Sequence, residues 1–310
     1  MQGDSTGRMT DDADNRRGAG LMMASMAAFT INDVFVKAAS AELSLGQILL
    51  LRGVIAIAVL FGLARHFRAF RRIPGRDARL IALRCAAEIG AAYFFLTALL
   101  ALPIANVTAI LQSVPLTVTL CAALFLGEAV GWRRWSAIVA GFVGMLLITR
   151  PGTGDFTAAS AYVLIAVCFV TLRDLVTRRM SVEVPSLLVT LSAAIAVTLF
   201  AVGLTAVQGW APVTARASGM VVGSALFVTA GYFLSVAAMR VGDVGAVSPF
   251  RYTSLIWALV LGWAVFGEWP EPLTFLGAAI IVSAGVFTLR RGRRVRARSE
   301  TQPARAPRPR

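Results

Sequence analysis

The chain has 310 residues, of which 57% are hydrophobic and only 15% are charged, and its mean hydropathy is +0.74. An ordinary soluble domain carries about 25% charged residues and cannot bury this much apolar surface, so the composition excludes a soluble globular protein. The formal net charge of +14 would suit a nucleic-acid-binding protein, but the positions of the basic residues favour another explanation.

Long apolar segments with short connections fill nearly the whole chain. A helix needs about 20 apolar residues to cross about 30 Å of hydrocarbon, and on this basis we predict an all-α polytopic membrane protein with ten transmembrane helices. A nine-span alternative would merge the third and fourth spans, which only Leu102-Pro103 separates, but the merged run of about 48 residues is too long for one crossing. We expect the spans at about 19–38, 44–64, 79–99, 103–126, 132–150, 157–177, 184–207, 217–238, 244–266 and 272–290.

The first span follows an acidic tail, residues 1–17. A signal peptide is the alternative interpretation of this region. The segment lacks a small-residue cleavage site and ends in polar residues that include Asp33 and Lys37, so we expect a span that is retained.

Basic residues concentrate in alternate connections. If the N-terminus is cytoplasmic, the inner segments hold most of the arginines, above all in the loop from Arg65 to Arg79 and in the tail 292–310, while the outer loops keep only three basic residues. This positive-inside pattern predicts a bacterial inner-membrane protein with both termini in the cytoplasm. We expect the basic tail to contact anionic lipid headgroups and expect no nucleic-acid partner.

Several other functions lack the residues they need. Cys85, Cys121 and Cys168 lie in three different spans without metal-ligand or disulfide spacing, so we expect no metal site. The only lysine is Lys37, and no phosphate-binding G-x-x-x-x-G-K-[ST] loop is present, which excludes an ATP-driven pump. Because no cluster of His or acidic residues occurs, we predict that the chain is not an enzyme and uses no cofactor.

The sequence contains an internal repeat. When the chain is aligned with itself, residues 126–128 fall on 266–268, and the trio Thr30, Asp33 and Lys37 falls on Thr171, Asp174 and Arg178. Two halves of five spans follow, and since five is odd the halves must be inverted, as in many secondary transporters. Gly127-Glu128 and Gly267-Glu268 close equivalent spans, and we interpret them as structural hinges where a carboxylate meets water.

Motifs in both halves resemble one known family, the EamA family of the drug/metabolite transporter superfamily. The first copy comprises 103–111 (PIANVTAIL), 125–128 (FLGE), 132–135 (WRRW) and 141–144 (GFVG), and the second comprises 247–253 and 266–270. The resemblance runs from about 18 to 291. It implies a ten-span permease with two inverted five-helix repeats around a central cavity. The implied organisation is an N-terminal tail 1–17, repeats 18–150 and 151–291, and a C-terminal tail 292–310.

Charges inside the apolar spans are the main candidates for a functional site. Placing one at the bilayer centre costs about 2.5–3.5 kcal/mol, so such residues indicate function. Glu88 is expected near the midplane, with Arg84 one turn away, and Arg52 and Arg251 each lie about 11–12 Å inside their span ends. Two interpretations stay open: Glu88 forms a structural ion pair with an arginine, or Glu88, Arg52 and Arg251 line the cavity and bind a polar or anionic group.

Polar and aromatic residues of the spans complete the candidate site. A polar stripe on a membrane-buried helix must face protein or water. Pro115 and Pro249 free backbone carbonyls, and the two expected consequences are a bend in the helix or contact between a carbonyl and the solute. Packing is the alternative role for the aromatic residues. The further cavity candidates are Asn106, Gln112, Ser113, Tyr93, Tyr252 and Trp257, and the gate or ion-pair candidates are Asp33 with Lys37, Asp174 with Arg178, and Arg84.

These observations predict a secondary transporter for a small organic metabolite. Family members carry amino acids, vitamins, nucleotide-like metabolites and drugs in either direction, and we favour uptake of a vitamin or nucleoside-like solute such as riboflavin. The alternatives are an exporter of amino acids, metabolites or drugs, and a non-transporting structural or sensory membrane protein. The expected partners are the solute and the lipid bilayer, and a homodimer stays open.

Overall fold

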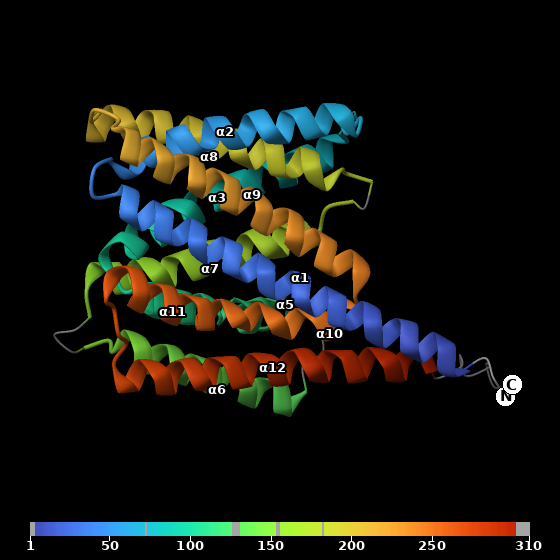
Figure 1. The fold of residues 1–310 in the computed structure, drawn as a ribbon. Coiled ribbons are helices and arrows are strands. Elements are labelled where there is room, and N and C mark those ends of the chain that lie inside the picture. The colour runs from blue at the N-terminus through green and yellow to red at the C-terminus, as the bar shows by residue number, and fades with distance from the viewer. Residues whose placement is uncertain (1–3, 72, 126–130, 153–155, 182, 302–310) are drawn as a thin grey trace, which may run out of the picture.

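The computed structural model describes residues 4–71, 73–125, 131–152, 156–181 and 183–301, and within these ranges it consists of helices and their connections without strands (Figure 1). The helices are α1 (Asp4–Ala39), α2 (Leu45–His66), α3 (Gly75–Ala101), α4 (Ile104–Leu111), α5 (Val114–Phe125), α6 (Trp132–Thr149), α7 (Ala158–Arg178), α8 (Ser186–Gln208), α9 (Ala215–Val241), α10 (Val244–Val247), the 3₁₀-helix η1 (Ser248–Thr253), α11 (Ser254–Phe266) and α12 (Pro272–Thr301).

Nine segments of the described chain are helical, long and apolar enough to cross a membrane. One of them combines α4 with α5, and another combines η1 with α11. The tenth predicted span corresponds to α6, an 18-residue helix. Its first turn contains Arg133 and Arg134, which lower the hydropathy of this short helix. The predicted all-α membrane fold is confirmed.

The first and last helices of the chain, α1 and α12, are longer than the spans predicted for them. α1 begins at Asp4 and α12 continues to Thr301, so most residues expected to form tails extend these helices instead. The extensions contain no proline and are rich in residues that tolerate a helix, while Pro303 follows the end of α12 in the sequence. Apolar length marks the membrane crossing but does not mark where a helix ends.

Local signals account for several helix ends. The side chain of Ser44 accepts a hydrogen bond from the Gln47 amide at 3.3 Å and caps α2. Thr214 caps α9 in the same way, accepting from the Ala217 amide at 3.0 Å. These contacts satisfy amides that have no partner within their helix. Gly267, which ends α11, has a φ of 66°, a conformation that favours glycine.

The fourth crossing of each half is interrupted, as the two prolines predict. α4 ends at Leu111, and Pro115 cannot supply the amide that would bond to the Leu111 carbonyl. The chain instead makes tighter bonds there, with the Ser113 amide donating to the Ile110 carbonyl at 3.0 Å. In the second half, Pro249 lies in η1, directly before α11.

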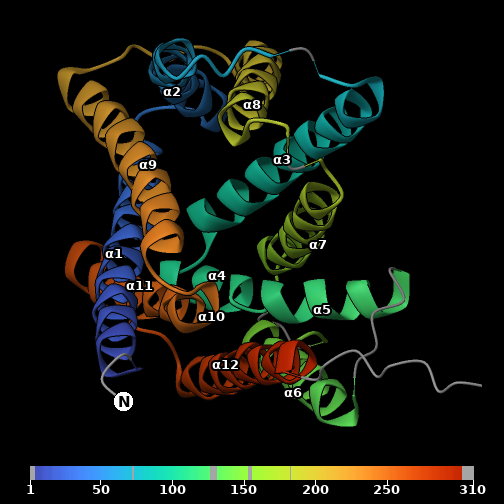
Figure 2. The same cartoon turned by 90° about the vertical axis from the view of Figure 1, so that its right-hand side faces the viewer.

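Helix packing follows the symmetry of two inverted repeats. The principal packed pairs are α1 with α9, α3 with α7, α2 with α8 and α6 with α12, and α4 also packs against α11. The first helix of each half therefore contacts the third helix of the other half. The second, fourth and fifth crossings of one half each contact the crossing with the same number in the other half. A two-fold axis produces this exchange. Figure 2 shows the α2–α8 and α6–α12 pairs on opposite sides of the bundle, with α1–α9 and α3–α7 between them.

The start of α1 and the end of α12 lie at the same end of the bundle (Figure 1), which we call the near end. The C-terminal ends of α1, α3 and α11 lie at the opposite end, which we call the far end. Near the far end, a core of buried apolar residues such as Val36, Ile48 and Ile104 joins the first four crossings.

Candidate functional site

An ion cluster joins α3 to α7 inside the apolar bundle. Glu88 Oε1 lies 3.4 Å from Arg173 Nη1, and Glu88 Oε2 lies 3.6 Å from Arg84 Nη2. Arg173 also lies 2.9 Å from Asp174 Oδ1, and Arg84 Nε donates to Thr177 Oγ1 at 3.1 Å. We call Arg84, Glu88, Arg173 and Asp174 the α3–α7 cluster. Two acids face two bases, so their charges balance.

A second polar group surrounds the Asn32 side chain, which is only 5% exposed. Asn32 Oδ1 accepts from Arg52 Nη1 at 3.2 Å and from Ser224 Oγ at 2.8 Å. Asn32 Nδ2 donates to Asp33 Oδ1 at 2.9 Å. We call Asn32, Asp33, Arg52 and Ser224 the Asn32 network. It joins α1, α2 and α9, so both halves of the chain contribute to it.

Tyr232 of α9 connects the two groups. Arg52 of the Asn32 network and both Glu88 and Arg173 of the α3–α7 cluster lie within electrostatic range of its hydroxyl. Its side chain is nevertheless 49% exposed, and its ring is nearly perpendicular to the Phe29 ring, with the two centroids 5.1 Å apart. The two polar groups therefore belong to one region, which α1, α2, α3, α7 and α9 share.

A third polar group lies at the far end. Lys37 Nζ donates to Glu268 Oε1 at 2.5 Å and to the Leu102 carbonyl at 2.6 Å. Glu268 Oε2 accepts from the Ile104 amide at 2.9 Å, and so caps α4. Lys37 Nζ also lies 5.3 Å from the centre of the Phe266 ring. We call this group the far-end latch, because it ties α1, the α3–α4 junction and the end of α11 together.

The predicted i,i+4 ion pairs are wrong. Lys37 is paired with Glu268 rather than Asp33, because its long side chain reaches the end of the helix. Asp174 is paired with the neighbouring Arg173, while Arg178 is exposed at the end of α7 and has no ion-pair partner among the described residues. The water-facing role expected for Glu268 is also wrong, since its side chain is 20% exposed and paired. Glu128, its counterpart in the repeat, lies outside the described residues.

Glu88, Arg52 and Arg251 make no direct contact with one another in the described part of the chain. Glu88 bonds to arginines of α3 and α7, and Arg52 bonds to Asn32. Arg251 is exposed, and only its carbonyl takes part in a described hydrogen bond, accepting from Gln112 Nε2 at 3.1 Å. Gln112 also donates to Ser254 Oγ at 2.5 Å. Gln112 therefore ties together the two interrupted crossings, a role that stabilises the breaks.

The other predicted cavity residues divide between packing and exposed positions. Ser113 is fully buried and donates to the Ile110 carbonyl at 2.6 Å. Tyr252 is 6% exposed and packs against Gly285 of α12, and Tyr93 packs among aromatic rings. Trp257 is 37% exposed. Asn106 Oδ1 and the Tyr252 hydroxyl are buried without a hydrogen-bond partner in the described part of the chain.

Reasoning from the sequence did not place Asn32, Arg173 or Ser224 in a polar site. Arg173 had a visible signal, because it is a charge inside an apolar segment like Arg52 and Glu88. Asn32 and Ser224 had no comparable signal, since single amides and hydroxyls are common in membrane helices and their pairing joins residues far apart in sequence.

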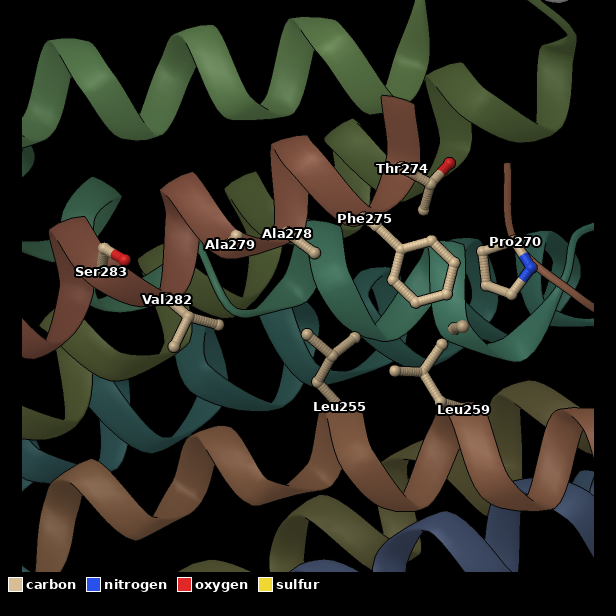
Figure 3. Close-up of a pocket in the computed structure, with 10 residues that line it drawn as sticks. Leu255, Leu259, Pro270, Thr274, Phe275, Ala278, Ala279, Val282 and Ser283 are labelled. Atoms are coloured by element: carbon tan, nitrogen blue, oxygen red, sulfur yellow. The ribbon is translucent and has the colours of Figure 1, made fainter. Parts of the chain in front are cut away.

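A separate cavity of about 380 Å³ lies between α4, α11 and α12 (Figure 3). Leu255, Leu259 and Phe275 form much of its wall, and its lining contains no charged residue. None of the predicted site residues lines it. This cavity therefore suits apolar groups, and the polar groups described above form the better site for a polar solute.

The fold is that of a multi-pass membrane protein with two inverted five-helix repeats. In the polar groups described above, acidic and basic side chains lie between its helices in equal numbers. The chain belongs to the EamA-like transporter family, whose model matches residues 16–150 and 157–290. The two matches correspond to the two repeats, and they confirm the family that the sequence motifs predicted.

Individual relatives differ in the solute they are named for. The S-adenosylmethionine uptake transporter of Rickettsia bellii is 26% identical over 60% of this chain and 64% of its own. The riboflavin transporter of Rhizobium johnstonii is 32% identical over 62% of this chain and 64% of its own. These two matches thus span just under two thirds of each relative. The pseudopaline exporter CntI of Pseudomonas aeruginosa is 24% identical over 86% of this chain and 94% of its own.

A solved structure shares the fold. A crystal structure of another protein superposes with a TM-score of 0.58, covering 86% of this chain and 97% of its own, at 16% sequence identity.

Proposed function

We propose that the protein is a secondary carrier that moves a small organic solute across the bacterial inner membrane. The observation that carries this proposal is the single polar region formed by the Asn32 network, Tyr232 and the α3–α7 cluster. Both repeats contribute charged or polar side chains to it. Such groups are costly inside a membrane, and carriers with inverted repeats bind their solutes between the repeats.

The proposed orientation puts the near end in the cytoplasm and the far end outside the membrane. The arginine-rich loop between α2 and α3 and the arginine-rich end of the chain support it. In this arrangement residues 1–17 and 292–310 are cytoplasmic extensions of repeats 18–150 and 151–291. The far-end latch then closes the outer side of the carrier.

For the solute, we propose a vitamin or nucleoside-like compound that is taken up, such as riboflavin or S-adenosylmethionine. The names of two relatives support this class. The exposed ring of Tyr232, next to the Phe29 ring, offers a surface for a flat ring system. A solute gradient or exchange would drive transport, and the protein would catalyse no chemical reaction.

Export is the second candidate direction. It is favoured by one specific observation, namely that the pseudopaline exporter matches 86% of this chain, whereas the S-adenosylmethionine uptake transporter and the riboflavin transporter match 60% and 62%. Inverted repeats permit transport in either direction, because each repeat can take the arrangement of the other.

Uptake can be tested in a bacterium that can neither make riboflavin nor import it. Cells that express the protein should accumulate radiolabelled riboflavin, or S-adenosylmethionine in a parallel assay, above an empty-vector control. The matched negative control is Glu88→Gln, which removes the acid at the centre of the α3–α7 cluster. If membrane-inserted protein gives no accumulation of either solute, inverted vesicles, whose cytoplasmic face points outward, will test export as accumulation of the same radiolabelled solutes inside the vesicles. Failure in both directions would refute a carrier for this solute class.

A further inference from the structure

We infer that the Asn32 network binds the α-amino acid group of a solute, with Arg52 receiving the carboxylate and Asp33 receiving the ammonium. This inference deepens the proposed carrier function and depends on it. It identifies the part of the solute that is recognised, and it distinguishes an amino-acid-bearing solute from an uncharged ring compound.

Asp33 and Arg52 carry opposite charges but are held apart. In the part of the chain that the structure describes, they form no direct ion pair, and each bonds instead to the amide of Asn32. Both side chains are partly exposed, whereas Asn32 between them is buried. A separated acid and base with accessible surfaces can each accept an outside partner.

The orientation of the Asn32 amide is determined by its neighbours. Its oxygen faces two donors, Arg52 Nη1 and Ser224 Oγ, and its nitrogen faces an acceptor, Asp33 Oδ1. A flipped amide would place its nitrogen against the Arg52 donor and its oxygen against the Asp33 acceptor, so only one orientation satisfies all three contacts. Asn32 is therefore a positioning residue, which fixes where the acid and the base lie.

Capacity for further bonds remains on both charged groups. A guanidinium has five N–H donors, and the described contacts of Arg52 use one of them. A carboxylate has two oxygens, and the hydrogen bond to Asp33 occupies Oδ1. A solute carboxylate can therefore bond to Arg52 while its ammonium bonds to Asp33. The added charges cancel, so the region stays neutral when loaded.

The α3–α7 cluster is a poorer candidate for this role. Each of its arginines already lies against a carboxylate, with Glu88 between Arg84 and Arg173. A charged solute would have to compete with these ion pairs. Tyr232, within electrostatic range of Arg52, instead offers its exposed ring to the remainder of the solute.

The test measures competition in proteoliposomes of the full chain, with radiolabelled S-adenosylmethionine as the transported probe. One competitor is its decarboxylated form, which lacks the carboxylate, and the other is its α-keto analogue, which lacks the ammonium. In the wild type each should compete about 10- to 100-fold less well than S-adenosylmethionine, the effect of losing one charge-assisted hydrogen bond. Arg52→Gln should abolish discrimination against the decarboxylated form only, and Asp33→Asn should abolish discrimination against the keto analogue only.

Controls separate recognition from folding. Arg216→Gln and Glu183→Gln make the same chemical changes at exposed positions and should leave both discriminations intact. Arg52→Lys, which keeps the charge, should retain part of the carboxylate preference, and thermal unfolding in detergent will show whether each variant folds. Equal loss of all three ligands in a folded Arg52→Gln protein would overturn the inference. Transport of riboflavin without transport of S-adenosylmethionine would overturn it and leave the carrier standing, whereas transport of neither would overturn both.

Discussion

Lys37 Nζ and Glu268 Oε1 lie 2.5 Å apart and join the first helix of one repeat to the end of the fourth crossing of the other. The same carboxylate caps α4 through the Ile104 amide, so one ion pair holds three segments together at the far end. A carrier that opens toward this end must separate the two residues, because they belong to different repeats.

A double-mutant cycle on this pair should show strong coupling. Lys37→Met and Glu268→Gln each leave one partly buried partner alone, and each should lower the free energy of unfolding by about 2 kcal/mol, below the effect of breaking a fully buried pair. The double variant should be more stable than the sum of the single effects implies, by about 1–3 kcal/mol. Thermal or denaturant unfolding in detergent micelles measures all four proteins.

The pair Arg216–Glu42 provides a matched comparison in the described structure. It also lies at the far end, but its atoms are 3.8 Å apart and the Arg216 side chain is 78% exposed. A cycle on this exposed pair should give a coupling below about 1 kcal/mol. Equal coupling in the two cycles would show that the Lys37–Glu268 contact does not hold the far end closed.

Glu88→Gln should separate the two interpretations of the α3–α7 cluster. Asp174 still neutralises Arg173 in this variant, so we expect the protein to fold and its transport rate to fall about tenfold or more, the effect of losing a charge-assisted contact. The measurement is initial uptake rate per folded protein, with detergent gel filtration as the folding readout. Aggregated Glu88→Gln protein, with recovery in a Glu88→Gln/Arg84→Gln double variant, would instead assign Glu88 a structural ion pair.

The sequence predicted the fold better than it predicted the site. Apolar length and punctuation located the helices, and Pro115 and Pro249 marked both interrupted crossings, because these are local properties of the chain. Ion pairing depends on which helices meet. Lys37 and Glu268 are far apart in the sequence, so only the packing of α1 beside α11 makes them partners rather than Lys37 and Asp33.

Single intramembrane charges were recognisable, but their partners were not. Glu88 and Arg52 stand out in apolar segments, and both occupy polar groups. Arg251 stands out in the same way and is exposed, since the 3₁₀ turn at Pro249 changes the direction of its side chain relative to a continuous helix. Local backbone breaks therefore limit any prediction of helix faces.

The proposed orientation predicts where reporter enzymes will work. Alkaline phosphatase fused within the α8–α9 connection, at Ala211, should be active because this enzyme requires the oxidising exterior. The same enzyme fused after Thr301 should be inactive, and green fluorescent protein fused there should fluoresce. Activity with the opposite pattern would place the basic segments outside and refute the proposed topology.

Close contact between α6 and α12 predicts a position-specific effect of adding one methyl group. A Cβ atom at Gly144 would lie 2.7 Å from the Gly277 carbonyl oxygen. This distance is too short, and because the oxygen belongs to the backbone of α12, it cannot move aside without shifting that helix. Gly144→Ala should therefore lower the free energy of unfolding by about 1–3 kcal/mol, as overpacking does. Gly203→Ala is the matched control, because a Cβ atom there meets no neighbour within 4 Å, and it should be neutral or stabilise the helix by up to about 1 kcal/mol. Denaturant unfolding in detergent compares the two, and equal effects would mean that α6 and α12 are not packed backbone to backbone.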